Sequence, residues 1–71
     1  MTSFEKAIKT GMIRVGISSV QALAERSGIS RTTIYARFRY PQGCIAYELV
    51  ALSDVLGITI GELAETCRGK K

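Results

Sequence analysis

Apolar side chains recur every three or four positions along most of the chain, the spacing that gathers them on one face of an α-helix. Gly16, Gly28 and Gly57 divide this pattern at points where helices commonly end. Ser19 and Ser30 directly precede two of the segments, as helix N-caps do. We therefore expect an all-α protein with helices over residues 4–15, 20–27, 31–39, 44–56 and 59–67, and a loop at 41–43.

The first and fourth segments predict two buried stripes. Ser3 is the expected N-cap of the first helix, and Gly11 within it is expected to allow close packing against a neighbour. The expected stripes are Phe4, Ala7, Ile8, Met12 and Val15 in the first helix, and Ile45, Leu49, Leu52 and Leu56 in the fourth.

The stretch "ITI" at 58–60 is compatible with a short β-strand as well as with a helix start, because its isoleucines and threonine are β-branched. We favour a helix from Thr59, because "TIGELAE" continues the helical spacing and "TIGE" matches a capping box. Its apolar face comprises Ile60, Leu63, Ala64 and Cys67.

A chain of 71 residues with 46% apolar side chains predicts one domain, with a core over about 4–67 and a fraying basic tail at 68–71. No apolar run is long enough to cross a membrane, and the N-terminus lacks the pattern of a signal peptide. We therefore expect a soluble cytoplasmic protein.

The charge is unevenly distributed along the chain. Residues 1–40 contain seven basic and two acidic side chains, a net charge of +5, whereas residues 41–67 contain four acidic and no basic ones, −4. The last four residues add +3, which gives +4 in all. A basic half attracts polyanions. We expect the acidic residues Glu48, Asp54, Glu62 and Glu65 to face away from such a partner.

The side chains that carry most enzyme chemistry are scarce. There is no histidine, and two separated cysteines supply too few ligands for a zinc site. We expect no catalytic residue, metal or cofactor, and we interpret Cys44 and Cys67 as small core or boundary residues. A disulfide between them remains an alternative that no sign of secretion supports.

The stretch "LAERSGISRTTIYARFRYP" combines a sharp helix-to-helix corner with four arginines. Only Gly28, Ile29 and Ser30 connect the second and third predicted helices, so the two helices must cross steeply. Glycine tolerates the positive φ that such a turn requires. The third helix is expected to pass close to Ala24, whose small side chain allows this approach. Ile34 of the third helix is placed to pack back against Ala24. This arrangement specifies a helix-turn-helix.

The segment "SVQALAERSGISRTTIYARF" resembles the helix-turn-helix of the phage repressor and Cro family, and of the wider Xre-like regulators. Ala24, Gly28 and Ile34 match the family's alanine, glycine and branched aliphatic positions, and "LSDVLGITIGELAE" is similar to its fourth and fifth helices. The resemblance covers about 4–67 and implies a compact five-helix, lambda-repressor-like DNA-binding domain.

Arg37 departs from the family pattern, which has an aliphatic residue there, and we expect Phe38 to take over its core role. The run "TTIYARF" is also similar to the recognition helix of TetR-type regulators, but this chain lacks their large ligand domain.

The resemblance implies that the third helix enters the major groove of DNA. The implied base contacts are Arg31, Thr32, Tyr35 and Ala36. The implied phosphate contacts are Ser19, Val20, Gln21, Thr33, Arg37, Arg39 and Tyr40. The plainer alternatives are a simple cap for the α-helix start at Ser19, Val20 and Gln21, support of a cap for Thr33, a core position for Tyr35, and a solvated face for Tyr40 and the arginines.

The expected function is that of a repressor that binds a double-stranded DNA operator as a homodimer and needs no small-molecule ligand. The expected dimer patch lies in the C-terminal region and includes Ile58, Ile60 and Leu63, although these residues are also suited to closing the core. Two other functions remain open: a protein-interaction module such as an antitoxin or adaptor, and an excisionase-like architectural DNA binder.

Overall fold

The computed structural model describes residues 2–67, and five α-helices with one short 3-10 turn account for most of them. In chain order they are α1 (Ser3–Val15), α2 (Val20–Ser27), α3 (Arg31–Arg39), η1 (Pro41–Gly43), α4 (Ala46–Leu56) and α5 (Ile60–Cys67). No strand occurs within 2–67, so the prediction of an all-α fold is confirmed and the strand alternative at 58–60 is wrong.

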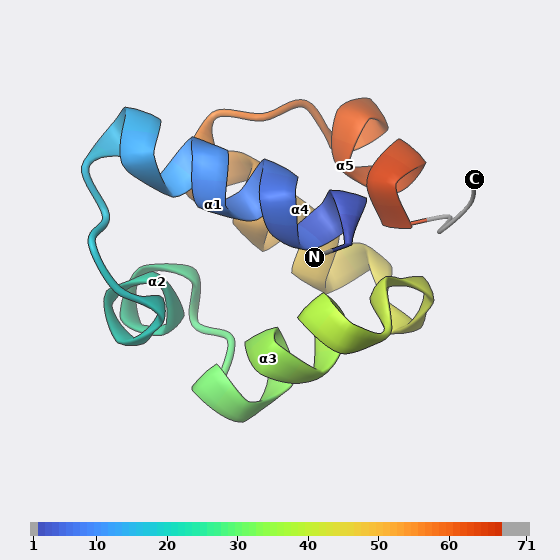
Figure 1. Cartoon of the computed structure of the whole chain (residues 1–71), viewed down its shortest axis with the longest axis horizontal. Helices are drawn as coiled ribbons and strands as arrows, with labels where there is room; N and C mark the ends of the chain where they lie inside the picture. The colour runs from blue at the N-terminus through green and yellow to red at the C-terminus, as the bar shows by residue number, and fades with distance from the viewer. Residues whose placement is uncertain (1, 68–71) are drawn as a thin grey trace.

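Helix α1 lies at the centre of the arrangement (Figure 1) and packs against α3, α4 and α5. Helix α2 packs against α3 and α4 on the remaining side. In the view of Figure 1, α5 and α3 lie on opposite sides of α1. The surface around α3 is therefore separated from the surface around α5.

One hydrophobic core joins all five helices. Its most deeply buried side chains include Ile8 of α1, Leu23 of α2, Ile34 of α3, Leu56 of α4 and Leu63 of α5. Each belongs to a set of apolar residues that repeats at helical spacing and forms one apolar face of its helix. The helices bury these apolar faces against one another. None of the helices within 2–67 is both long enough and apolar enough to cross a membrane.

The predicted helix ends at the helix-turn-helix corner are confirmed. Ser19 accepts a hydrogen bond from the Ala22 N–H at the start of α2, and Gly28 ends α2 with a φ of 78°. Thr59 and Glu62 form the predicted capping box, with hydrogen bonds of 3.1 and 3.4 Å. These local sequence signals therefore set the boundaries of α2 and the start of α5.

The prediction for the start of α1 is wrong by one residue. Thr2, not Ser3, is the N-cap, and its hydroxyl accepts a hydrogen bond of 3.1 Å from the Glu5 N–H. The same hydroxyl donates to the Phe38 carbonyl at 3.0 Å. This tertiary contact with the end of α3 favours Thr2 over Ser3. At the other end of α1, Val15 is 37% exposed rather than buried.

Helix α4 begins at Ala46, later than expected, and Ile45 is its exposed N-cap rather than part of the buried stripe. Glu48 explains the difference, because its Oε1 accepts the Ile45 N–H at 3.3 Å. Glu48 is only 5% exposed. Its carboxylate therefore lies inside the fold and adds no exposed negative charge to this half of the domain.

The expected dimer patch is largely core. Ile58 and Leu63 are buried, and only Ile60 is exposed, at 47%. The close packing expected at Gly11 is confirmed, because a Cβ there would lie 3.0 Å from Ile58 Cδ1 and 3.2 Å from Leu56 Cβ. The predicted basic tail, 68–71, lies outside the described residues.

Candidate nucleic-acid interface

The corner between α2 and α3 has the geometry expected of a helix-turn-helix. Gly28, Ile29 and Ser30 connect the two helices, and Figure 1 shows α2 almost end-on while α3 runs across the view. Ile29 is buried beneath the turn and Ile34 holds α3 on the core. The Tyr47 hydroxyl of α4 donates a hydrogen bond of 3.2 Å to the Gly28 carbonyl, which ties the corner to the rest of the domain.

One face of α3 is exposed and carries all four predicted base contacts. Arg31, Thr32, Tyr35 and Ala36 are all exposed, whereas Ile34 and Phe38 of the same helix are buried. Their spacing of three and four residues places them in a continuous row along the helix. The face combines a planar cation, a hydroxyl and a small residue that permits close approach, as major-groove readout requires.

The N-terminus of α3 is rigidly capped. Ser30 Oγ accepts the Thr33 N–H at 3.1 Å and donates to Thr33 Oγ1 at 2.9 Å. Thr33 is half-buried and belongs to the cap, the plainer of the two roles considered for it. Its predicted phosphate contact stays a prediction, as does that of Val20, which is half-buried at the start of α2.

Gln21 links the two helices across the corner. Arg31 Nη1 donates to Gln21 Oε1 at 3.4 Å, and both side chains are exposed. Together with Ser19 at the α2 N-terminus, Gln21 lies beside free backbone N–H groups of a kind that bind phosphate. The structure therefore brings the first predicted base contact and the predicted phosphate contacts of α2 onto one surface.

Phe38 takes the core position that the family pattern assigns to an aliphatic side chain one residue earlier. It is 5% exposed and packs against Phe4 with ring centroids 6.3 Å apart. Tyr35 lies at its edge in a T-shaped contact of 5.9 Å and remains 54% exposed. The alternative that Tyr35 is a core residue is thus wrong, since more than half of it faces solvent.

Arg37 is held in an ion pair that the sequence analysis did not anticipate. Its Nε and Nη2 donate to the two carboxylate oxygens of Glu48 at 2.8 and 3.1 Å. The hydrogen bonds from Arg37 hold the pKa of Glu48 below its ordinary value, against the effect of burial. Arg37 is therefore neither a solvated side chain nor one whose guanidinium is unoccupied and available to a phosphate, the two roles considered for it. Its spacing of 11 residues from Glu48 gives no local sequence signal.

Arg39 and Tyr40 follow at the end of α3, and both are exposed. Tyr40 is 60% exposed and is the C-cap of the helix. They extend the exposed row of α3 toward η1 with one cation and one hydroxyl. Both types of group bind phosphate oxygens.

Cysteine, aspartate and glutamate are the remaining side chains of residues 2–67 that could hold a metal or form a disulfide. No three histidine, cysteine, aspartate or glutamate side chains lie together as a metal site would require. Cys44 is half-buried and Cys67 is buried, and both thiols are free, so the alternative of a disulfide is not formed in this structure. Burial raises the pKa of Cys44 to about 12.

Two steeply crossed helices, a capped glycine corner and an exposed polar row on the second helix define a helix-turn-helix protein of the five-helix type. The comparison with family models agrees: residues 7–67 match the Cro/C1-type HTH DNA-binding domain. The chain therefore belongs to this family. Comparisons with curated proteins and with solved structures gave no match.

Proposed function

We propose that the protein is a transcriptional regulator that recognises a specific double-stranded DNA operator through the major groove. The observation that carries this proposal is the exposed row Arg31, Thr32, Tyr35 and Ala36 on α3 of a Cro/C1-type domain. Arg31 is suited to bidentate hydrogen bonding with guanine O6 and N7. Gln21, which accepts a hydrogen bond from Arg31, supports it from α2.

In this proposal phosphate contacts orient the domain on the duplex. Ser19, Val20 and Gln21 approach one phosphate at the α2 N-terminus, and Arg39 and Tyr40 approach another beyond α3. Arg37 is left out of this set, because its guanidinium is bonded to Glu48. Thr33 contributes through the cap of α3.

The proposed consequence is repression: the bound protein excludes RNA polymerase from the operator in the cytoplasm of a bacterium or phage-infected cell. One domain of this size reads few base pairs, so we propose a homodimer that binds two half-sites through contacts in its C-terminal region. Regulation then depends on protein concentration, and neither a small-molecule ligand nor catalysis is part of the proposed mechanism.

Substitution of Arg31 tests this function. Arg31→Ala removes the proposed guanine contact, so discrimination between a duplex selected by the wild type and a scrambled duplex should fall by about 1–3 kcal/mol. Arg26→Ala removes an exposed arginine of α2 that lies outside the proposed contacts and is the matched control. Unchanged discrimination in Arg31→Ala would contradict the proposed guanine contact of Arg31, and a wild type that selects no duplex at all would favour a protein-interaction module.

A further inference from the structure

Lys9 and Glu5 of α1 form an ion pair at the surface that none of the proposed DNA contacts uses. Lys9 Nζ lies 3.3 Å from Glu5 Oε2, one helical turn away, and the Lys9 side chain remains 48% exposed. Lys9 Nζ also lies 5.9 Å from the centre of the Phe38 ring of α3. The ammonium group is therefore held on the side of α1 that faces α3.

The ion pair lies between the two groups of residues that are proposed to contact phosphate. On one side, Lys9 lines a hollow with Ser19 at the start of α2. On the other side, Glu5 lines a second hollow with Tyr35 and Arg39 of α3. The Lys9–Glu5 pair thus adjoins both the α2 group and the α3 group.

We propose that Lys9 is a further contact to the DNA backbone, and that its pairing with Glu5 limits the affinity for DNA. Because the pair lies between Ser19 and Arg39, a duplex bound to both of these residues brings its phosphates close to Lys9. This inference rests on the proposed function and adds a residue of α1 to its interface.

Exchange of the Glu5 carboxylate for a phosphate costs little at this surface. A solvent-exposed ion pair contributes little and is screened by salt. A phosphate that is neutralised by lysine releases condensed counterions from the duplex, which favours binding. The released carboxylate stays in the first turn of α1, where the helix dipole favours negative charge. The exchange is therefore expected to proceed when DNA binds.

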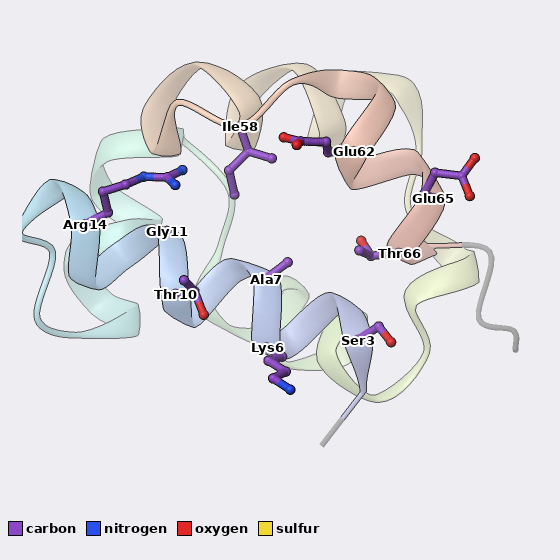
Figure 2. A pocket seen from close by; sticks show the side chains of 10 residues that line it. All are labelled: Ser3, Lys6, Ala7, Thr10, Gly11, Arg14, Ile58, Glu62, Glu65 and Thr66. Carbon is purple, nitrogen blue, oxygen red and sulfur yellow. The ribbon is translucent and has the colours of Figure 1, made fainter.

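The other cations of α1, Lys6 and Arg14, line a different surface, the groove between α1 and α5 (Figure 2). In Figure 1, α5 lies on the side of α1 away from α3. Arg14 is exposed, and the five positions from Lys9 to Arg14 turn the helix by roughly 140°. Arg14→Gln therefore removes the same charge from another face of the same helix and is the matched control.

Fluorescence anisotropy with the duplex selected by the wild type, over a series of salt concentrations, tests the contact. Lys9→Gln should bind about fivefold more weakly at about 0.1 M salt and lower the slope of log affinity against log salt by about one. It should weaken binding to a scrambled duplex equally, because phosphate carries no sequence information. Arg14→Gln should keep the wild-type slope. Lys9→Arg, which retains the cation, should keep it too.

The role of Glu5 is tested in two backgrounds. Glu5→Gln frees the ammonium group and should raise the affinity by about two- to fivefold. In Glu5→Gln/Lys9→Gln, the loss of Glu5 should bring little gain over Lys9→Gln, because no ammonium group remains to be freed. An equal gain in both backgrounds would show that Glu5 merely repels DNA and would overturn the proposed competition.

Circular dichroism establishes that each variant is folded, since Lys9 also lies over the Phe38 ring. An unchanged salt slope in Lys9→Gln would overturn the inference. So would an equal loss in Arg14→Gln, or a Lys9→Arg variant that binds no better than Lys9→Gln. In each case the wild type still binds its selected duplex and the Arg31→Ala comparison still reports base recognition, so the proposed function would stand. A wild type that binds no duplex would overturn the proposed function and this inference together.

Discussion

Arg37 and Glu48 join the end of α3 to the start of α4 through two hydrogen bonds of 2.8 and 3.1 Å. The same carboxylate accepts the Ile45 N–H, so one side chain both pairs with α3 and caps α4. Gly43 leaves room for the guanidinium, since a Cβ there would lie 2.9 Å from Arg37 Nη1. The ion pair therefore links α3 directly to α4 in the second half of the domain.

Removal of Arg37 should destabilise the protein strongly. Arg37→Met leaves the Glu48 carboxylate, which is 5% exposed, buried without its partner. A charge left unpaired in this way costs about 3 kcal/mol. Urea denaturation measures the loss in the free energy of unfolding.

Two further variants show whether that loss comes from the ion pair. Arg39→Met removes a neighbouring exposed arginine and should change the stability by less than about 0.5 kcal/mol. Arg37→Met/Glu48→Leu removes both charges and should recover a substantial part of the loss, because no unpaired carboxylate remains. Equal losses of unfolding free energy in Arg37→Met and Arg39→Met would contradict the stabilising role of the Arg37–Glu48 pair.

The same pair predicts a pH dependence of stability. Hydrogen bonding from Arg37 lowers the pKa of Glu48 in the folded protein. A carboxyl group with a lowered pKa stabilises the fold above its unfolded pKa, and this contribution is lost as the pH falls through the folded value. The difference in unfolding free energy between the wild type and Arg37→Met should therefore be largest near neutral pH and shrink below about pH 4.5, near the reference pKa of glutamate. A difference that stays constant down to pH 2 would contradict this.

Two glycines in helices should respond in opposite directions to substitution by alanine. Gly11→Ala introduces a Cβ 3.2 Å from Leu56 Cβ, an atom close to the backbone in the fully buried core. We expect this crowding to outweigh the gain in helix propensity and to lower the stability by about 1 kcal/mol. Gly61→Ala meets no atom within 4 Å. It should raise the stability by about 0.5 kcal/mol. Thermal unfolding of both variants checks the two signs.

The thiols should be poorly reactive in the folded protein. Burial raises the pKa of Cys44 to about 12 and also raises the pKa of Cys67. The thiolate is the reactive form, so alkylation by iodoacetamide at pH 8 should be more than about tenfold slower than in urea. Mass spectrometry of the modified protein over time measures both rates. Similar rates in the two conditions would show that these thiols are not protected by the fold.

Local signals in the sequence predict much of this fold. Ser19, Gly28 and Ser30 set the corner because each acts on backbone groups within a few residues of itself. Ile34 and Phe38 identify the buried side of α3, and therefore its exposed side. These features are enough to place the candidate interface before the tertiary structure is known.

Several of the errors arise where distant parts of the chain meet. Thr2 replaces Ser3 as the cap of α1 because its hydroxyl also reaches the Phe38 carbonyl. Arg37 resembles a free cation in the sequence, and only the fold brings Glu48 to it. Helical spacing does not reveal how far a side chain such as Ile60 remains exposed, because that depends on which helices cover it.

Selection of bound duplexes from a random DNA library, followed by a salt titration on the selected duplex, is the decisive measurement of whether this protein recognises a specific operator. We expect an inverted-repeat motif with half-sites about one helical turn apart. We also expect an affinity that falls steeply with salt as phosphate contacts are lost. If no motif emerges and only weak, salt-sensitive binding to any duplex remains, the claim that this protein recognises a specific operator is contradicted.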